Sequence, residues 1–224
     1  MQPGSVQTGG SPQEAKPEMT MIQGFVTPVL KCSFPNCDEL NEGLRALILR
    51  MANPEPTDHR SNVGGWHSQN DFLKSDDHYV RQLLEWITTA VTGMTQATGG
   101  SEIATKGDFT VLGWANVLYP GGYNKAHTHN SYAWSGVYYV DIGDEAAKDQ
   151  LSGIIEFIDP RAGVGSPLVP GDPFDQPLYF RPEAGQLFMF PGWLRHYVHP
   201  YTGQRPRISV AFNVRWDRRE TKTA

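Results

Sequence analysis

The chain has 224 residues and a formal net charge of −5, with 19 Lys and Arg side chains against 24 Asp and Glu. This mixed charge offers no extended basic surface, so we expect neither nucleic acid nor an anionic membrane as a partner. The two cysteines, Cys32 and Cys37, are too few for a disulfide framework or a structural zinc site. No secretory leader or run of about eighteen apolar residues is recognisable, and we therefore expect a cytoplasmic protein.

The length favours a single domain, because one hydrophobic core serves chains of up to about 250 residues. Residues 1–20 are rich in Gly, Pro, Ser and Gln and contain few large apolar side chains. This composition predicts a disordered tail. We expect residues 21–224 to form one folded domain.

The N-terminal half predicts one strand and two amphipathic helices. The strand is expected within residues 22–34, and the first helix within residues 36–53, capped by Asn36 or Asp38. The buried stripe of this helix would consist of Leu40, Leu44, Leu47 and Met51.

A polar stretch, residues 54–75, separates the two predicted helices. It is long for a loop inside a compact domain, and we interpret it as a lid. The second helix is expected from about Asp77 to Thr98. Its buried stripe would consist of Val80, Leu83, Leu84, Ile87, Val91 and Met94.

From Asp108 onward the pattern changes from helical to extended. Short runs rich in Val, Ile, Tyr, Phe and Trp alternate with Gly, Pro and Asp turn signals. These runs are FTVLGWANVLY, YAWSGVYYVDI, GIIEFIDP, PLYFRP, GQLFMFP, LRHYVHP and RPRISVAFNVRW. Because the helices come first and the strands last, we expect an α+β, mainly β fold of the sandwich or jelly-roll type.

Three histidines form a candidate metal site. His127 and His129 lie two positions apart, so in a strand both point to the same face. His196 follows a turn that begins at Pro191 and can supply a third nitrogen from a distant strand. The alternative for each single histidine is a packing or hydrogen-bonding role in an aromatic-rich strand.

The last predicted strand carries a candidate anion site. Arg207 and Ser209 are also two positions apart and share a face with Arg205 and Asn213. A buried arginine is costly unless it pairs with an anion, and its planar guanidinium matches a carboxylate. The pattern therefore predicts a metal and a carboxylate ligand side by side.

Four segments together resemble the iron(II)- and 2-oxoglutarate-dependent dioxygenases, in particular their bacterial and phage group. The segments are SNVGGWHS, WANVLYPGGYNKAHTHNSYAWSGVYYV, GIIEFIDPR and GQLFMFPGWLRHYVHPYTGQRPRISVAFN. The resemblance implies a cupin-like double-stranded β-helix with N-terminal supporting helices, Fe(II) as the metal and 2-oxoglutarate as cosubstrate. It runs from about Phe25 to Trp216.

By this resemblance, His127 is the first iron ligand and His196 the distal one. Arg207 would bind the far carboxylate of 2-oxoglutarate with Ser209 beside it, and Arg205 is the second choice for that role. The chain departs from the family at His129, where relatives have Asp or Glu. Either three histidines hold the iron, which we favour, or His129 lies outside the ligand set.

Four further residues are candidates for cosubstrate or substrate contacts. Asn116 and Tyr119 would hydrogen-bond the cosubstrate, the alternative being turn and packing roles. Trp66 and His67 in the expected lid would contact substrate or close the core.

The resemblance implies hydroxylation of an unactivated C–H bond in a small molecule, amino acid or peptidyl substrate, with release of succinate and CO2. The partners would be 2-oxoglutarate, O2 and an unidentified substrate, and the oligomeric state, a homodimer included, is left open. One alternative is a cupin-like three-histidine metalloenzyme that does not use 2-oxoglutarate. The other is a non-enzymatic jelly-roll binding protein.

Overall fold

The computed structural model describes residues 20, 24–53, 57–99, 109–144, 151–161 and 177–216. Apart from Thr20, the predicted tail lies outside these residues. The helical elements are α1 (Asp38–Met51), η1 (Phe72–Lys74) and α2 (His78–Gly99). The strands are β1 (Leu30–Ser33), β2 (Thr57–His59), β3 (Asn62–His67), β4 (Phe109–His127), β5 (Trp134–Asp141), β6 (Ile155–Phe157), β7 (Leu178–Phe180), β8 (Gln186–Pro191), β9 (His196–Val198) and β10 (Arg207–Trp216).

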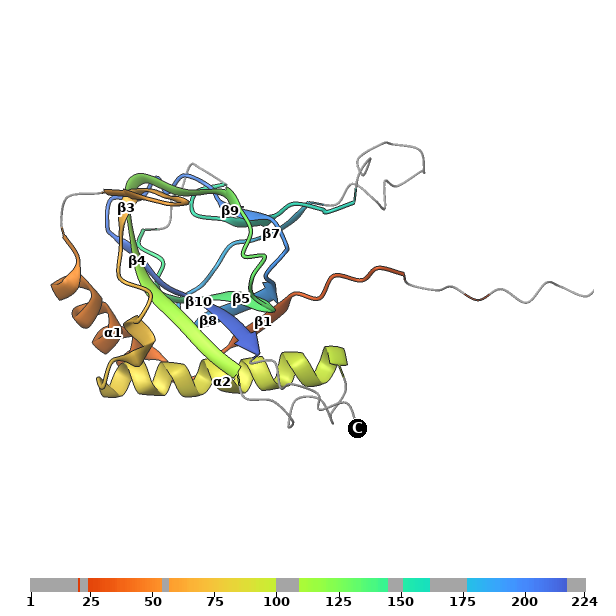
Figure 1. Ribbon diagram of the computed structural model, residues 1–224. Coiled ribbons are helices and arrows are strands. Elements are labelled where there is room, and N and C mark those ends of the chain that lie inside the picture. Colours follow the sequence, from red (N-terminus) through yellow and green to blue (C-terminus); the bar gives the residue numbers. More distant parts are fainter. Residues whose placement is uncertain are drawn as a thin grey trace, which may run out of the picture.

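The strands form one antiparallel sheet that curls into two layers (Figure 1). Its order is β1-β8-β5-β10-β4-β9-β6-β7, with the β2–β3 hairpin paired to β4. β1, β8, β5, β10 and the first half of β4 make the layer beside the helices, and the second half of β4 joins β3, β9, β6 and β7 in the other layer. The expected jelly-roll architecture with N-terminal helices is confirmed.

β4 is a single long strand that passes from one layer to the other. We expected its strand to end at Tyr119, whereas the structure continues it through Pro120, Gly121 and Gly122 to His127. Gly121 has a φ of +84°, and a Cβ on Gly122 would lie 2.8 Å from the Gly64 carbonyl oxygen. The two glycines therefore allow the strand to bend against β3 instead of ending in a turn.

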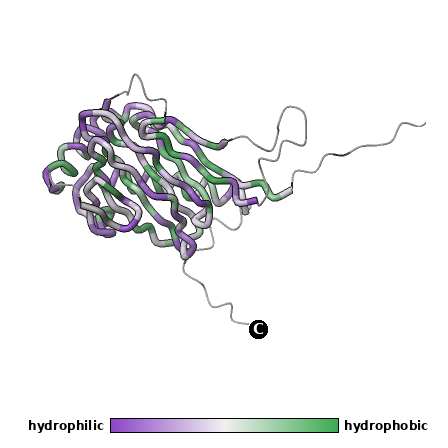
Figure 2. The backbone as a smooth tube through the Cα atoms, turned by 90° about the horizontal axis from the view of Figure 1, so that it is seen from above, coloured by the Kyte–Doolittle hydropathy of each residue, from purple (hydrophilic) through white to green (hydrophobic). Residues whose placement is uncertain are grey.

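The helices cover the outer face of the first layer (Figure 1). α2 buries the predicted stripe, with Leu84 only partly covered. The neighbouring β10 turns Ile208, Val210, Phe212 and Val214 into the same core. Figure 2 shows apolar residues gathered along the strands of the body. Within the described residues, no helix is both long and apolar enough to cross a membrane.

The predicted stripe of α1 is wrong at its C-terminal end. Leu40 and Leu44 are buried as expected, but Met51 is 49% exposed and Ile48 is fully buried in its place. The helix stripe follows the 3.6-residue period, which places Ile48 four positions after Leu44 on the core side. The expected cap is also wrong, since the N-cap is Cys37 without a side-chain hydrogen bond.

The long loop expected over residues 54–75 is largely ordered into the sheet. β2 and β3 form a hairpin, β3 pairs with β4, and η1 follows. A Cβ on Gly65 would lie 2.6 Å from the Val117 carbonyl oxygen, so glycine is what permits this close pairing. The described part of residues 57–75 is therefore built into the sheet through β3, and it is not a free lid.

Replacing Ile48 with Ala should lower the free energy of unfolding by about 2–5 kcal/mol, because it leaves a cavity in the helix–sheet core. Met51→Ala removes a half-exposed side chain and should change stability by about 0.5 kcal/mol or less. Urea denaturation of the two variants measures the difference. A larger loss in Met51→Ala than in Ile48→Ala would show that the buried face of α1 is the one expected from the sequence.

Candidate functional site

A cavity of about 310 Å³ lies between the two layers. β10 supplies one wall by placing every second side chain, Arg207, Ser209, Ala211 and Asn213, toward it. The opposite face of β10 packs on the helices, so the strand period separates core from cavity. All three predicted histidines line this cavity, and so does the predicted anion pair.

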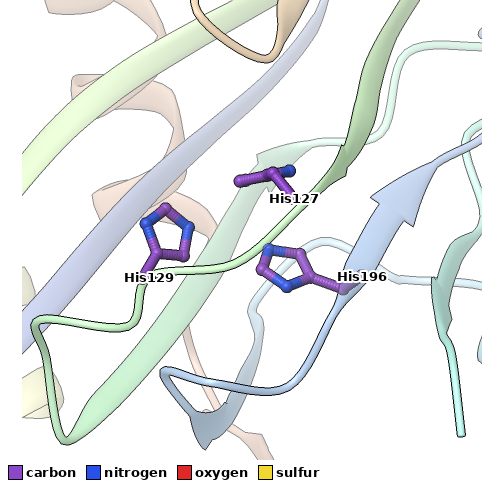
Figure 3. A group of neighbouring side chains, drawn as sticks. All are labelled: His127, His129 and His196. Atoms are coloured by element: carbon purple, nitrogen blue, oxygen red, sulfur yellow. The ribbon is translucent and has the colours of Figure 1, made fainter. Parts of the chain in front are cut away.

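The three histidine rings meet in the cavity (Figure 3). Their ligand atoms lie within 4.8 Å of one another, and the ring centroids are 4.4 Å apart for His127 and His196 and 4.9 Å apart for His127 and His129. His127 and His196 are direct partners in the β4–β9 ladder. The structure therefore brings together the residues that the spacing predicted.

His129 reaches the group by a route that differs from the prediction. His127 is the last residue of β4, and His129 lies in the following loop and not in the strand. Its backbone N–H donates to the Gly192 carbonyl at 2.6 Å, which ties the loop to the turn before β9. A Cβ on Gly192 would lie 2.6 Å from the His129 carbonyl oxygen, so only glycine permits this approach.

Backbone carbonyls orient two of the imidazoles. Nδ1–H of His127 donates to the Lys125 carbonyl at 2.6 Å, and Nδ1–H of His196 donates to the Leu194 carbonyl at 2.9 Å. This assignment leaves the Nε2 lone pair of each ring for the cavity. The Oγ of Ser61 lies 3.4 Å from Nε2 of His127.

The side chain of Asn213 contacts His129 where backbone carbonyls contact the other two imidazoles. Its Nδ2 lies 3.3 Å from Nδ1 of that ring, and its Oδ1 is buried without a hydrogen-bond partner among the described residues. Rotation of the amide by 180° would place Oδ1 against Nδ1–H and leave Nε2 of His129 as the metal-binding atom.

Burial keeps the three rings neutral. Desolvation lowers the pKa of His196 to about 3 and that of His129 to about 4, with the nearby His127 adding to both shifts. Desolvation also lowers the pKa of His127. Neutral imidazoles are the form that binds a metal, so the site is ready to bind one at neutral pH.

Arg207 is a buried cation without a carboxylate partner. It is 3% exposed, donates from Nη2 to the Gly153 carbonyl at 3.0 Å and lies over the Tyr139 ring at 5.0 Å. No ion pair joins it to any described residue. The Tyr139 hydroxyl is buried without a hydrogen-bond partner in the described structure, and Ser209 is buried on the same wall as Arg207. A buried guanidinium in this state requires an anion.

The donor set fits a divalent transition metal. Three imidazole nitrogens suit Fe, Zn, Cu or Ni, and the orienting carbonyls match the outer partners of metal-bound histidines. None of the described residues that line the cavity is Asp or Glu. The unpaired guanidinium and the unpaired Tyr139 hydroxyl in the same cavity fit a carboxylate.

Two predicted cosubstrate residues lie elsewhere. Arg205 is exposed and forms an ion pair with Asp144, with Nε 2.7 Å from Oδ1. It does not line the cavity, because the strand period begins at Arg207 and the preceding residues belong to a surface turn. The Tyr119 hydroxyl donates to the Asn53 carbonyl outside the cavity. Arg205, the second choice for the carboxylate partner, is therefore placed outside the cavity, which corrects that prediction. Tyr119 packs against the helix–sheet core.

Of the three remaining predicted contact residues, two line the cavity and one does not. Asn116 is buried and lines the cavity, as does His67, whose ring stacks on Trp114 at a centroid distance of 5.5 Å. Trp66 packs partly buried against the helix–sheet core and does not line the cavity. Because consecutive strand residues face opposite sides, β3 sends only His67 inward.

Three residues of the site escaped the sequence reasoning in these roles. Tyr139 and Arg60 are not among the residues predicted for the site, and Asn213 is predicted only to share the strand face of Arg207. The period-2 pattern places Asn213 on the cavity face, but its contact with His129 depends on a loop. No local signal reveals the unpaired Tyr139 hydroxyl.

The apoprotein should lose stability as the pH falls from about 6.5 toward about 4. An unfolded histidine has a pKa of about 6.5, so in this range the unfolded chain binds more protons than the folded one. The free energy of unfolding should fall by up to about 1.4 kcal/mol per pH unit for each buried histidine. Urea titrations of apoprotein across this range measure the slope.

His196→Asn should flatten the pH slope, and His78→Asn, at an exposed histidine, serves as the matched control. If all three proteins share one slope, burial of the site histidines does not govern the acid sensitivity.

Comparison with known proteins shows what the chain is similar to. Residues 113–213 match a protein-family model described as "Putative 2OG-Fe(II) oxygenase". No curated protein matches the chain.

Among solved structures, the chain is similar to a Pseudomonas putida prolyl-4-hydroxylase, with a TM-score of 0.59 and 15% identity over 86% of this chain and 94% of that one. It is similar to HygX from Streptomyces hygroscopicus with nickel and 2-oxoglutarate bound, with a TM-score of 0.55 and 12% identity over 84% and 82% of the two chains. A prolyl hydroxylase from Trichoplax adhaerens gives a TM-score of 0.55 and 10% identity over 83% of each chain. At these identities the likeness concerns the fold. The residues that match the 2OG-Fe(II) oxygenase model, 113–213, contain the three histidines and Arg207.

Proposed function

We propose that the protein is an Fe(II)- and 2-oxoglutarate-dependent dioxygenase that hydroxylates an unactivated C–H bond of a small molecule, amino acid or peptidyl substrate. Succinate and CO2 would be the coproducts. One observation carries the proposal: a single cavity holds three convergent neutral imidazoles and a buried guanidinium without a carboxylate partner. The match to the family model and the fold support it.

In this proposal His127, His129 and His196 hold the iron. The first and last are fixed by their ladder pairing and by backbone carbonyls, and His129 by its loop and Asn213. The resemblance to the dioxygenases implies a carboxylate at the position of His129. A neutral imidazole there leaves one more positive charge on the site, which favours an anionic coligand.

The far carboxylate of 2-oxoglutarate would bind Arg207. Nη2 already bonds to the Gly153 carbonyl, so the remaining N–H groups of the fork are the donors available to a ligand. Burial raises the pKa of Tyr139, so its hydroxyl stays protonated and can donate a further hydrogen bond. Ser209 supplies a hydroxyl on the same wall.

Bound iron and 2-oxoglutarate would activate O2, which is the oxidant for the C–H bond: one oxygen atom would go to succinate and the other to the hydroxylated product. The chain orients the reactants and excludes water. Apolar side chains close the walls between the metal and anion groups, and Phe190 packs on the His196 ring at a centroid distance of 4.5 Å. The other apolar wall residues include Leu112, Trp114, Val137, Ile155, Val198 and Ala211.

Anaerobic addition of Fe(II) and then 2-oxoglutarate should produce the weak visible charge-transfer band of the chelate. Arg207→Ala should weaken 2-oxoglutarate binding by about 2–5 kcal/mol, because a carboxylate loses its charge-assisted partner. Arg205→Ala is the matched control and should leave binding unchanged, because that side chain pairs with Asp144 at the surface. Spectrophotometric titration of the three proteins compares them.

The same titration separates the competing functions. Iron binding without a band would favour a three-histidine metalloenzyme that does not use 2-oxoglutarate. Absence of iron binding would make the histidines structural, as in a jelly-roll binding protein. A larger loss in Arg205→Ala than in Arg207→Ala would overturn the assignment of the anion partner.

Asn213→Leu should lower the affinity for Fe(II) about 10- to 100-fold, because the His129 ring loses the contact that fixes its orientation. Asn213→Asp retains an acceptor for Nδ1–H and should bind Fe(II) at least as tightly as the parent. Competition with a chelating dye under anaerobic conditions measures both, alongside thermal unfolding of the apoproteins. Unchanged affinity in the Leu variant would remove Asn213 from the metal site.

A further inference from the structure

The turn between β2 and β3 lies against the histidine group. It consists of Arg60 and Ser61, and the Ser61 carbonyl accepts a hydrogen bond from the Lys125 backbone N–H at 2.8 Å. The Ser61 hydroxyl is 3.4 Å from Nε2 of His127. Both turn residues line the cavity. The hairpin therefore fixes the position of Arg60 relative to the proposed iron ligands.

Arg60 is a cation at the mouth of the cavity. Its side chain is exposed, lines the cavity and has no ion pair or hydrogen bond with any described residue. Its charge contributes to the lowered pKa of His129, after desolvation and the effect of His127, so its field reaches the ring. A charge in this place acts on whatever occupies the metal side of the cavity.

The backbone at Arg60 is strained. Its φ is +54°, in the left-handed region that Gly, Asn or Asp usually occupies in a hairpin turn. An arginine there is less stable than glycine would be, and its side chain makes no hydrogen bond or ion pair with a described residue that would offset the strain. Such an outlier at a cavity mouth indicates a functional requirement.

None of the charged residues described in the cavity lining is an anion that could pair with Arg60. Among the described lining residues, Arg60 and Arg207 are the only arginines or lysines, and none is Asp or Glu. Arg207 is committed to 2-oxoglutarate in the proposed function. The second cation lies on the histidine side of the cavity, where the substrate must approach.

We propose that the substrate carries a carboxylate that pairs with Arg60 while its reacting C–H bond faces the histidine group. This inference rests on the proposed function and names the substrate class for the same site. The guanidinium fork matches a carboxylate, and the amide of Asn124 lines the same cavity one residue from the Lys125–Ser61 contact. A cavity of about 310 Å³ that also holds 2-oxoglutarate leaves room for a compact acid.

The test uses the full-length protein loaded with Fe(II) and 2-oxoglutarate, after the chelate band has been verified. Matched pairs of N-acetyl amino acids and their carboxamides are screened for stimulation of O2-dependent succinate release, and calorimetry under anaerobic conditions measures their binding. We expect the stimulating compounds to be acids, with at least tenfold weaker binding of the corresponding amides.

Variants of Arg60 then test whether the preference for acids depends on its guanidinium. Arg60→Ala should raise KM for the stimulating acid at least tenfold and leave the 2-oxoglutarate affinity unchanged, and Arg60→Lys should lie between the two proteins. Arg50→Ala removes an exposed arginine from α1 and is the matched control. Arg60→Gly should lose acid binding while its unfolding midpoint stays equal to or above that of the parent, because glycine relieves the positive φ.

Three outcomes overturn the proposal on Arg60 while the dioxygenase function stands. These are equal stimulation by acids and amides, no binding of any acid by a protein that forms the chelate, or a 2-oxoglutarate affinity that falls in Arg60→Ala. If the chelate band never forms, the failure belongs to the proposed function, and the substrate assignment falls with it.

Discussion

The continuity of β4 is the constraint on which the site depends. Its first half pairs with β10, which carries Arg207 and Ser209, and its last residues pair with β9, which carries His196. One strand therefore sets the separation between the anion end and the histidine end of the cavity. The glycines lie where the β3–β4 register shifts between Val63 and Gly65, and they let β4 bend from one layer to the other.

The described lining of the cavity contains no carboxylate. It holds cations and neutral imidazoles, and the fold buries one of the cations, Arg207, almost completely. Burial of an unpaired charge opposes folding, so the free protein holds an unfavourable electrostatic state that an anionic ligand relieves.

Much of this arrangement is visible in the sequence because strands have a period of two. The pairs His127/His129 and Arg207/Ser209, together with a distant His196, predict from the sequence alone the residues that line the cavity. His129 joins the other two histidines by a different route from the predicted one, because it lies in a loop that Gly192 holds in place.

The errors share a physical cause. A run such as SNVGGWHSQNDF has loop composition, and only long-range pairing with β4 makes it a hairpin. The YPGGY segment contains turn residues, yet it continues β4, because Tyr123 pairs with Val63 and the two glycines bond to the Tyr201 backbone. Local pattern also cannot show that Arg205 finds Asp144 or that the Tyr139 hydroxyl finds no partner. These facts belong to tertiary contacts and not to sequence period.

The replacement of an expected lid by a hydrogen-bonded hairpin changes how a ligand would enter. A mobile loop must be ordered when it closes, and that loss of conformational entropy opposes binding. Here the wall beside the histidines is already ordered by its ladder with β4 before any ligand arrives. Selection among molecules would then occur by size and charge at a preformed opening, and entry would be governed by diffusion and desolvation more than by closure of this segment.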